Sequence, residues 1–218
     1  MNAATLTMDG LTTTNEPVRF ARPSRTRTVE VVSDDEDAQL MLAYARGEMR
    51  AFETLYSRHR GALYRYLMRQ ARDGEIANDL FQEVWSRVIV NRARYEPRAK
   101  FRTFLFTLAH NCFIDHCRRT KTRASGMGID DADEADLLPA AEELQPDAVL
   151  VREEASCRYR AALASLPAEQ RDVYLLHEES DLSLEDIARV TGVGAETAKS
   201  RLRYAVSKLK AALSVAEA

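Results

Sequence analysis

The stretch FRTFLFTLAHNCFIDHCRRTK, residues Phe101–Lys121, combines the pattern of a buried helix with a polar face. Its apolar residues recur at helical spacing, which predicts that one side of the helix lies in a core. The apolar residues are Phe101, Phe104, Leu105, Leu108 and Cys112. Another face carries Thr103, Thr107, Asn111 and Arg118. We expect that second face to be open to a partner.

Basic and aromatic residues alternate ahead of this helix and again at its end. The basic residues are Arg92, Arg94, Arg98, Lys100, Arg102, Arg118, Arg119, Lys121 and Arg123, and the rings among them are Tyr95, Phe101 and Phe104. Guanidinium groups can follow phosphates while rings stack on unpaired bases, so this pattern is typical of a surface for single-stranded nucleic acid. The alternative is a core helix whose arginines only keep its outer side solvated. The stretch by itself leaves both interpretations open.

Composition favours an all-α protein. Of the 218 residues 45% are hydrophobic and 30% are charged, which suits packed cores with a large wetted surface. Glycine and proline are scarce, at 8 and 6 residues. The formal net charge of −3 argues against binding to a polyanion by total charge, so the segregation of basic and acidic segments matters more.

The cysteines and the apolar runs indicate a cytoplasmic protein. Cys112, Cys117 and Cys157 are odd in number and have no disulfide-framework spacing, and no signal peptide begins the sequence. No apolar run approaches the roughly 20 residues that a membrane-spanning helix needs. We therefore expect a reducing compartment and no membrane insertion.

The chain divides into four segments. Residues 1–33 are polar, contain several arginines and predict a disordered arm, either a plain tail or one with some affinity for DNA or a partner. Residues 34–121 predict a compact domain of about four helices. Residues 122–146 are acidic and without periodicity, which predicts a flexible linker. Residues 147–218 predict a second helical domain.

Local signals place the helix ends in the first domain. Ser33 is the expected N-cap of the first helix, because acidic residues follow it. A break is expected near Gly47, a turn at Asp73-Gly74 and a loop ahead of Phe101, where Pro97 interrupts the chain.

The second domain contains the pattern of a helix-turn-helix. Ser183 is placed to cap a short helix and Asp186 to reach back to the cap backbone, close to a capping box. A turn around Gly192 leads to a basic last helix. Residues placed to read base edges are Glu196, Thr197, Lys199, Ser200 and Arg203. Arg201, Lys208 and Lys210 are placed to meet phosphates. The alternative is an ordinary surface helix with a basic last turn.

Four blocks of sequence follow one another outside the N-terminal arm. They are AFETLYSRHRGALYRYLMR at 51–69, ANDLFQEVWSRVI at 77–89, RYEPRAKFRTFLFTLAHNCFIDHCRR at 94–119, and SLPAEQRDVYLL at 165–176 with LSLEDIARVTGVGAETAKSRLRYAVSKLK at 182–210. In this order and spacing they resemble bacterial sigma factors of the sigma-70 superfamily, in the small two-domain extracytoplasmic-function (ECF) group. The resemblance implies a sigma region 2 bundle followed by a sigma region 4 helix-turn-helix.

The resemblance also implies three sets of contacts. In the family, the helix matching Asn78–Ile89 docks on a coiled coil of the largest RNA polymerase subunit, which assigns core binding to Asp79, Gln82, Glu83 and Arg87. The next loop and helix match the part that opens the minus-ten promoter element and holds a flipped base. The residues so assigned are Tyr95, Arg98, Lys100, Arg102, Asn111, Asp115, Arg118 and Arg119. The last helix matches the reader of the minus-thirty-five duplex, which assigns Glu196, Thr197, Lys199, Ser200, Arg201, Arg203 and Lys208.

The implied function is that of a transcription initiation factor that directs polymerase core to promoters. The expected partners are the largest-subunit coiled coil, the flap of the second-largest subunit, promoter DNA and a separate anti-sigma factor. No enzymatic activity, catalytic residue or cofactor is expected. Departures from the family pattern are Asn78 where Glu is common, Trp85 where Phe is common, and Gly194 where a capping Ser is common.

Two other functions fit parts of the sequence. A stand-alone helix-turn-helix regulator would bind duplex DNA without polymerase, but it gives no reason for the basic and aromatic residues between Tyr95 and Arg119. A metal site could use Cys112 and His116, which are four residues apart on one helix face. No second ligand pair at a family spacing accompanies them, and Cys112 belongs to the apolar face, so no metal is expected.

Overall fold

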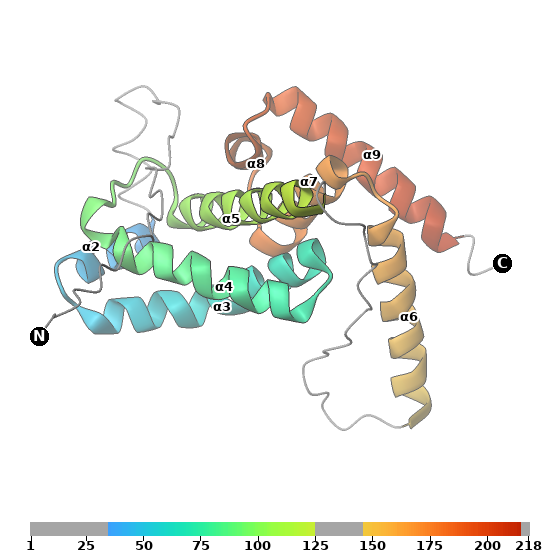
Figure 1. Ribbon diagram of the computed structural model, residues 1–218, viewed down its shortest axis with the longest axis horizontal. Helices are drawn as coiled ribbons and strands as arrows, with labels where there is room; N and C mark the ends of the chain where they lie inside the picture. The colour runs from blue at the N-terminus through green and yellow to red at the C-terminus, as the bar shows by residue number, and fades with distance from the viewer. Residues whose placement is uncertain (1–34, 125–145, 215–218) are drawn as a thin grey trace, which may run out of the picture.

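The computed structural model describes residues 35–124 and 146–214, and every regular element in these ranges is a helix (Figure 1). The elements are α2 Glu36–Ala45, α3 Met49–Ala71, α4 Gly74–Val90, the short 3₁₀ turn η1 Arg92–Arg94, α5 Phe101–Ala124, α6 Pro146–Ala164, α7 Ala168–Ser180, α8 Leu184–Thr191 and α9 Ala195–Ser214. The all-α prediction is confirmed. The predicted arm, the Ser33 cap and most of the acidic linker lie outside the described residues.

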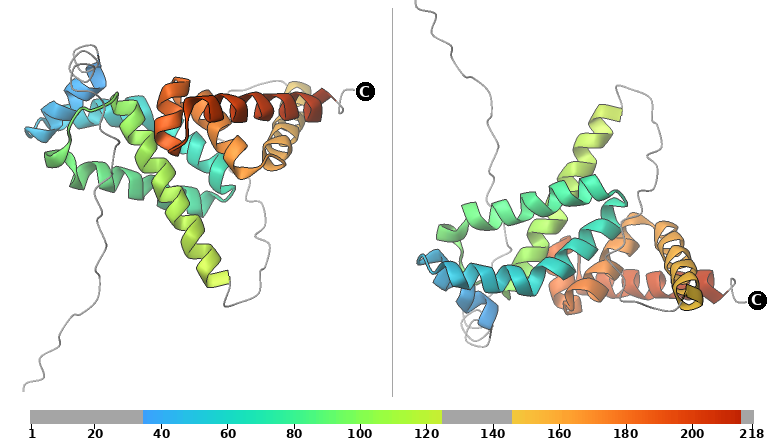
Figure 2. Two further views of the ribbon diagram at one scale, coloured as in Figure 1. Left: turned by 90° about the horizontal axis from the view of Figure 1, so that it is seen from above. Right: turned by 90° about the horizontal axis from the view of Figure 1, so that it is seen from below.

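Helices α2 to α5 form a first unit in which α3 and α4 run antiparallel and α5 crosses them (Figure 2). The carboxylate of Asp35 ties two of these helices together. It accepts hydrogen bonds from the backbone N–H of Asp37, at 3.2 Å, and of Phe101, at 2.6 Å. One side chain therefore caps the starts of both α2 and α5.

An aromatic cluster fills the space between α3 and α4. The Trp85 ring meets the rings of Tyr56 at a centroid distance of 5.0 Å and Phe52 at 5.7 Å, and Phe81 closes the cluster at 6.3 Å from Trp85. These edge and tilted contacts suit the quadrupoles of aromatic rings. The cluster sets the register of the two helices.

Helices α6 to α9 form a second unit, from which α6 extends away (Figure 1). The predicted helix-turn-helix is confirmed as α8 and α9. Gly192 ends α8 with φ +69°, a left-handed conformation that glycine adopts without strain. Ser183 caps α8 by accepting from the N–H of Asp186 at 3.2 Å. The capping-box detail is wrong, because the Asp186 carboxylate accepts from the Ser183 hydroxyl, at 2.7 Å, instead of the cap backbone.

The two units pack against each other, with α3 against α7 and α5 against α7 and α8. Most of these contacts link residues that lie 78 to 114 positions apart in the sequence. Among the helices in the described ranges, none is long and apolar enough to cross a membrane.

Candidate nucleic-acid interface

The C-terminal turns of α5 extend beyond the rest of the first unit (Figure 2). The Arg118 side chain is 78% exposed and the Arg119 side chain 60% exposed, while Asn111, about two turns earlier, is half-buried. Asp115 lies 3.9 Å from the Arg118 guanidinium. This end of α5 therefore presents two exposed positive charges about two turns beyond a half-buried amide.

The loop ahead of α5 presents its basic residues but not its tyrosine. Arg98 and Lys100 are exposed, although Arg98 is paired with Glu96 at 2.5 Å. Tyr95 is buried against Phe101 and Phe104, with its ring 5.1 Å from that of Phe104. Its hydroxyl has no partner among the described residues, and burial raises the pKa of Tyr95. In this conformation the Tyr95 ring belongs to the core and is not on the surface.

The open face expected along the first turns of α5 is wrong. Thr103 and Thr107 are buried, because α7 and α8 of the second unit cover this side of the helix. The Thr103 hydroxyl donates to Asp186 at 3.0 Å, and the Arg102 guanidinium donates to the carbonyl of Ser180 at 3.1 Å. The polar face continues to the surface only from Asn111 onwards.

The predicted polymerase-binding residues lie on the outer side of α4. Asp79 and Gln82 are exposed. Glu83 and Arg87, in contrast, have partners inside the first unit. They pair with each other at 2.5 Å, and two longer pairs, Arg87–Asp115 at 3.8 Å and Glu83–Arg119 at 3.7 Å, reach α5. The candidate polymerase and minus-ten surfaces are thus joined by ion pairs.

The reading face of α9 is open to solvent. Exposed residues on it are Glu196, Thr197, Lys199, Arg203 and Lys208, and Ser200 is half-buried. Arg201 differs from the expectation, because its guanidinium pairs with Glu169 of α7 and its side chain is only 23% exposed. Sequence reasoning missed Tyr204, which is 52% exposed and lies under the Arg203 guanidinium at 5.2 Å. The sequence did contain a signal for Tyr204, because this aromatic residue directly follows Arg203, which was predicted to read bases.

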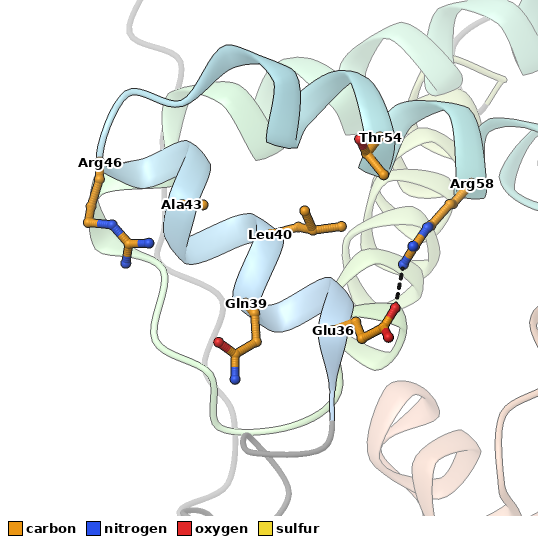
Figure 3. A pocket seen from close by; sticks show the side chains of 7 residues that line it. All are labelled: Glu36, Gln39, Leu40, Ala43, Arg46, Thr54 and Arg58. Carbon is orange, nitrogen blue, oxygen red and sulfur yellow. Dashed lines mark hydrogen bonds and ion pairs between the residues drawn. The ribbon is translucent and has the colours of Figure 1, made fainter.

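A shallow groove between α2 and α3 is separate from all these surfaces (Figure 3). Its volume is about 500 Å³, and the exposed carboxylate of Glu36 pairs with Arg58 at 3.3 Å across one end. The lining residues are Glu36, Gln39, Leu40, Ala43, Arg46, Thr54 and Arg58. None of the predicted DNA-contacting or polymerase-contacting residues lines it.

The residues considered for a metal site do not converge. Within the described ranges no three His, Cys, Asp or Glu side chains gather in a way that could hold a metal ion. Cys112 is buried in the core, and this burial raises the pKa of its thiol to about 12. A thiolate, which metal binding needs, is therefore disfavoured at Cys112.

Two family descriptions match the chain. Residues 55–123 match sigma-70 region 2 and residues 158–209 match sigma-70 region 4. RNA polymerase sigma factor CarQ of Myxococcus xanthus is 30% identical over 171 residues, which cover 78% of this chain and 93% of that protein. The ECF RNA polymerase sigma factor EcfG of Rhodopseudomonas palustris is 34% identical over 139 residues, 64% of this chain and 72% of that protein.

Solved structures share the fold. The sigma factor RpoE of Bartonella quintana, in complex with the anti-sigma factor NepR, has a TM-score of 0.64 and 22% identity, covering 75% of this chain and 97% of that one. CnrH in complex with the cytosolic domain of CnrY has a TM-score of 0.61 and 23% identity, covering 83% of this chain and 99% of that one.

Proposed function

The chain belongs to the ECF group of sigma factors and is a transcription initiation factor, and we propose that its two units contact two different promoter elements. Residues 34–121 bind polymerase core and capture unpaired minus-ten bases. Residues 147–218 bind the minus-thirty-five element as duplex DNA. The observation that carries this proposal is that the basic end of α5 and the polar face of α9 are both exposed in one chain of this family.

The minus-ten surface is the end of α5 together with the basic loop. Arg118 and Arg119 track phosphates, and Asn111 offers both a donor and an acceptor to a base edge. Unstacking a base costs a few kcal/mol, and stacking on a protein surface gives about 1–3 kcal/mol per base back. Capture of one or two bases would offset the cost of opening, so no catalytic group is required.

The polymerase surface is the outer face of α4, led by Asp79 and Gln82, with Glu83 and Arg87 beside them. A patch of mixed charge and amide groups suits a polar coiled-coil surface on the largest subunit. The ion pairs from Glu83 and Arg87 to α5 hold this patch in a fixed relation to the minus-ten surface. The flap of the second-largest subunit is the proposed partner of the second unit.

Duplex DNA meets the N-terminal turns of α9. Lys199 and Arg203 suit guanine, Glu196 can accept from cytosine, and both kinds of contact are made in the major groove. Lys208 lies nine residues after Lys199 on α9 and is placed to contact a phosphate. Arg201 reaches a phosphate only if it leaves Glu169.

A separate anti-sigma factor is the proposed regulator. Both solved structures named above are complexes with a partner protein, and one of them is a sigma factor bound to an anti-sigma factor. The proposal extends that kind of partner to this chain.

Run-off transcription with sigma-free polymerase core tests the proposed function. We expect promoter-selective transcripts with the full chain. The double variant Asn111→Ala, Arg118→Ala should lower them at least about tenfold, because the two lost contacts together exceed about 1.4 kcal/mol. Arg158→Ala, an exposed arginine of α6 outside the proposed surfaces, is the matched control and should leave the yield unchanged. Tight duplex binding without polymerase, and no transcripts with it, would favour a stand-alone regulator instead.

A further inference from the structure

The contact between the two units joins acidic side chains of α7 and α8 to basic and polar side chains of α3 and α5. Glu179 of α7 is held by two arginines of α3, Arg65 at 2.7 Å and Arg69. Its side chain is only 6% exposed, although both arginines reach solvent. An acidic group enclosed in this way lies between opposite charges and away from most of the screening salt.

A second acidic group, Asp172, is also enclosed by the first unit. It accepts hydrogen bonds from the Tyr66 hydroxyl at 2.8 Å and the Gln70 amide at 2.6 Å, both from α3. His110 of α5 lies 3.0 Å from its other oxygen. Tyr66 is fully buried, and burial together with the nearby carboxylate raises its pKa well above the ordinary value, so it stays a donor to Asp172.

The same contact covers part of the predicted minus-ten surface. The Asp186 carboxylate of α8 accepts a hydrogen bond from the Thr103 hydroxyl. The Ser180 carbonyl, at the end of α7, accepts one from the Arg102 guanidinium. These groups sit on the side of α5 that leads to Asn111. A carboxylate and a backbone carbonyl of the second unit therefore accept from donors that DNA would otherwise be able to use.

While the two units are packed together, their DNA-contacting surfaces lie too close to each other to reach the minus-ten and minus-thirty-five elements at the same time. One turn of duplex spans about 34–36 Å, so elements about 25 base pairs apart lie about 85 Å from each other. A compact unit of about 90 residues has a radius of gyration near 12 Å, so the centres of two touching units lie only about 30 Å apart. The units must separate before both elements are held.

We propose that the acidic face formed by Asp172, Glu179 and Asp186 is an internal ligand of the first unit, and that it holds the free protein in a closed, inactive form. The contact contains these polar and charged pairs beside buried apolar residues that form one continuous core through both units. Interfaces of such mixed character open more readily than wholly apolar ones. Separation hydrates the paired groups on both sides, so no buried charge is left behind. The inference rests on the proposed function, since it concerns access to the same promoter surfaces.

Small-angle scattering of the full-length protein, without polymerase or DNA, measures the closure directly. Glu179→Arg places a third positive charge against Arg65 and Arg69 and should increase the radius of gyration. Arg69→Glu, made from the other side of the contact, should do the same. The double variant Arg69→Glu, Glu179→Arg restores a pair of opposite charges across the contact. Its radius of gyration should return towards that of the unchanged protein.

The matched control is Glu178→Arg, the same charge change one residue earlier. The Glu178 carboxylate is half-exposed and contacts His177, not the first unit. This variant should scatter like the unchanged protein. Far-ultraviolet circular dichroism on each variant separates opening from loss of helix, because opening leaves the helical signal intact. An unchanged radius for both folded single variants would overturn the proposal.

Titration of polymerase core then measures the inhibition. Apparent affinity falls in proportion to the fraction of protein that is binding-competent, so Glu179→Arg should bind core about three- to tenfold more tightly than the unchanged protein and Glu178→Arg. An opened variant with unchanged core affinity would show that closure is not inhibitory and would overturn that part of the proposal. Failure of every variant to bind core, with the scattering differences present, would instead count against the proposed function.

Discussion

At the scale of single residues, a buried group and a half-buried group of the first unit affect the stability of the fold in opposite directions. Trp85 is 5% exposed, and its indole N–H has no hydrogen-bond partner among the described residues. Asp37 is fully engaged, with His59 at 2.7 Å on one oxygen and Arg58 at 2.7 Å on the other. A buried donor without a partner costs free energy, whereas a carboxylate bound by two donors contributes stability.

Trp85→Phe should change the free energy of unfolding by less than about 1 kcal/mol. The smaller ring loses some packing but also removes the unpaired N–H, so the two effects oppose each other. Trp85→Ala should cost about 3–5 kcal/mol, because nothing then fills the space among Phe52, Tyr56 and Phe81. Urea unfolding followed by circular dichroism gives both values. A loss of more than about 2 kcal/mol in Trp85→Phe would mean that the indole N–H has an unseen partner.

Asp37→Asn should destabilise the protein in a way that depends on pH. The hydrogen bond with His59, and then Arg58, hold the pKa of Asp37 below its usual value of 3.8, against an opposing effect of burial. The unfolded chain therefore binds the proton more readily, and the contribution of Asp37 is complete above about pH 4 and is lost as pH falls through the folded-state pKa. We expect a loss of about 1–2 kcal/mol at pH 6 that shrinks towards pH 3.

Unfolding of both proteins at several pH values checks this dependence. Glu36→Gln is the matched control, because Glu36 also contacts Arg58 but its side chain is 83% exposed. It should cost no more than about 0.5 kcal/mol at any of these pH values. A loss in Asp37→Asn that stays constant down to pH 3 would contradict a role for the charged carboxylate.

At the scale of helices, the turn between α8 and α9 depends on one backbone conformation. Gly192 has φ +69°, and it accounts for the direction in which the chain leaves α8 for α9. Gly194 marks the start of α9, since its carbonyl accepts from the N–H of Ala198 at 3.0 Å. Only the first of these two glycines needs a left-handed conformation.

Gly192→Ala should destabilise the second unit by about 1–2 kcal/mol, because a Cβ is strained at positive φ. Gly194→Ser is the matched control. The nearest atom to its Cβ is 4.0 Å away, and a serine can cap α9, so this change should raise stability by a few tenths of a kcal/mol. Thermal unfolding of each variant measures the difference, and a fall in stability of equal size for both would contradict a special role for Gly192.

Local signals in the sequence predicted the helices well. The capping serine of α8, the glycine that ends it and the break at Gly47 all lie where the pattern placed them. The first described helix, α2, begins at Glu36 with Asp35 as its N-cap, and the Asp35 carboxylate also caps α5. That second role links positions 66 residues apart, and no local pattern contains it.

The sequence predictions that were wrong concern residues whose exposure depends on tertiary packing. The Thr103 side of α5 is polar in sequence and was therefore expected to be exposed, yet Asp186 provides a buried partner from the other unit. Tyr95 was expected on the surface because basic residues flank it, but its ring packs on Phe101 and Phe104. Pairing of polar groups across units depends on tertiary packing, which hydrophobic periodicity does not report.

At the scale of the whole molecule, the polar contact between α3 and α7 couples the two units. The Asp172 network and the Glu179 pair are made only when both units are folded. Each unit therefore adds to the stability of the other, in the way that a bound ligand stabilises its receptor. Neither unit is energetically independent while the contact is closed.

Calorimetry of the unchanged protein at low salt should show one cooperative unfolding transition for both units. Glu179→Arg should split it into two, because the units lose their coupling and then melt at their own temperatures. Glu178→Arg should keep the single transition. Two separate transitions in the unchanged protein would mean that the contact is too weak to couple them.

The burial of Trp85 also provides a natural optical reporter. It is the chain's only tryptophan and it lies in the first unit, so selective excitation of indole observes that unit alone. Its emission reports the aromatic cluster behind the α4 surface, whereas the second unit is silent at that wavelength. Melting followed by tryptophan emission therefore tracks the first unit, and a probe of total helix content tracks both. In a variant whose units melt separately, the difference between the two curves isolates the second unit without any attached dye.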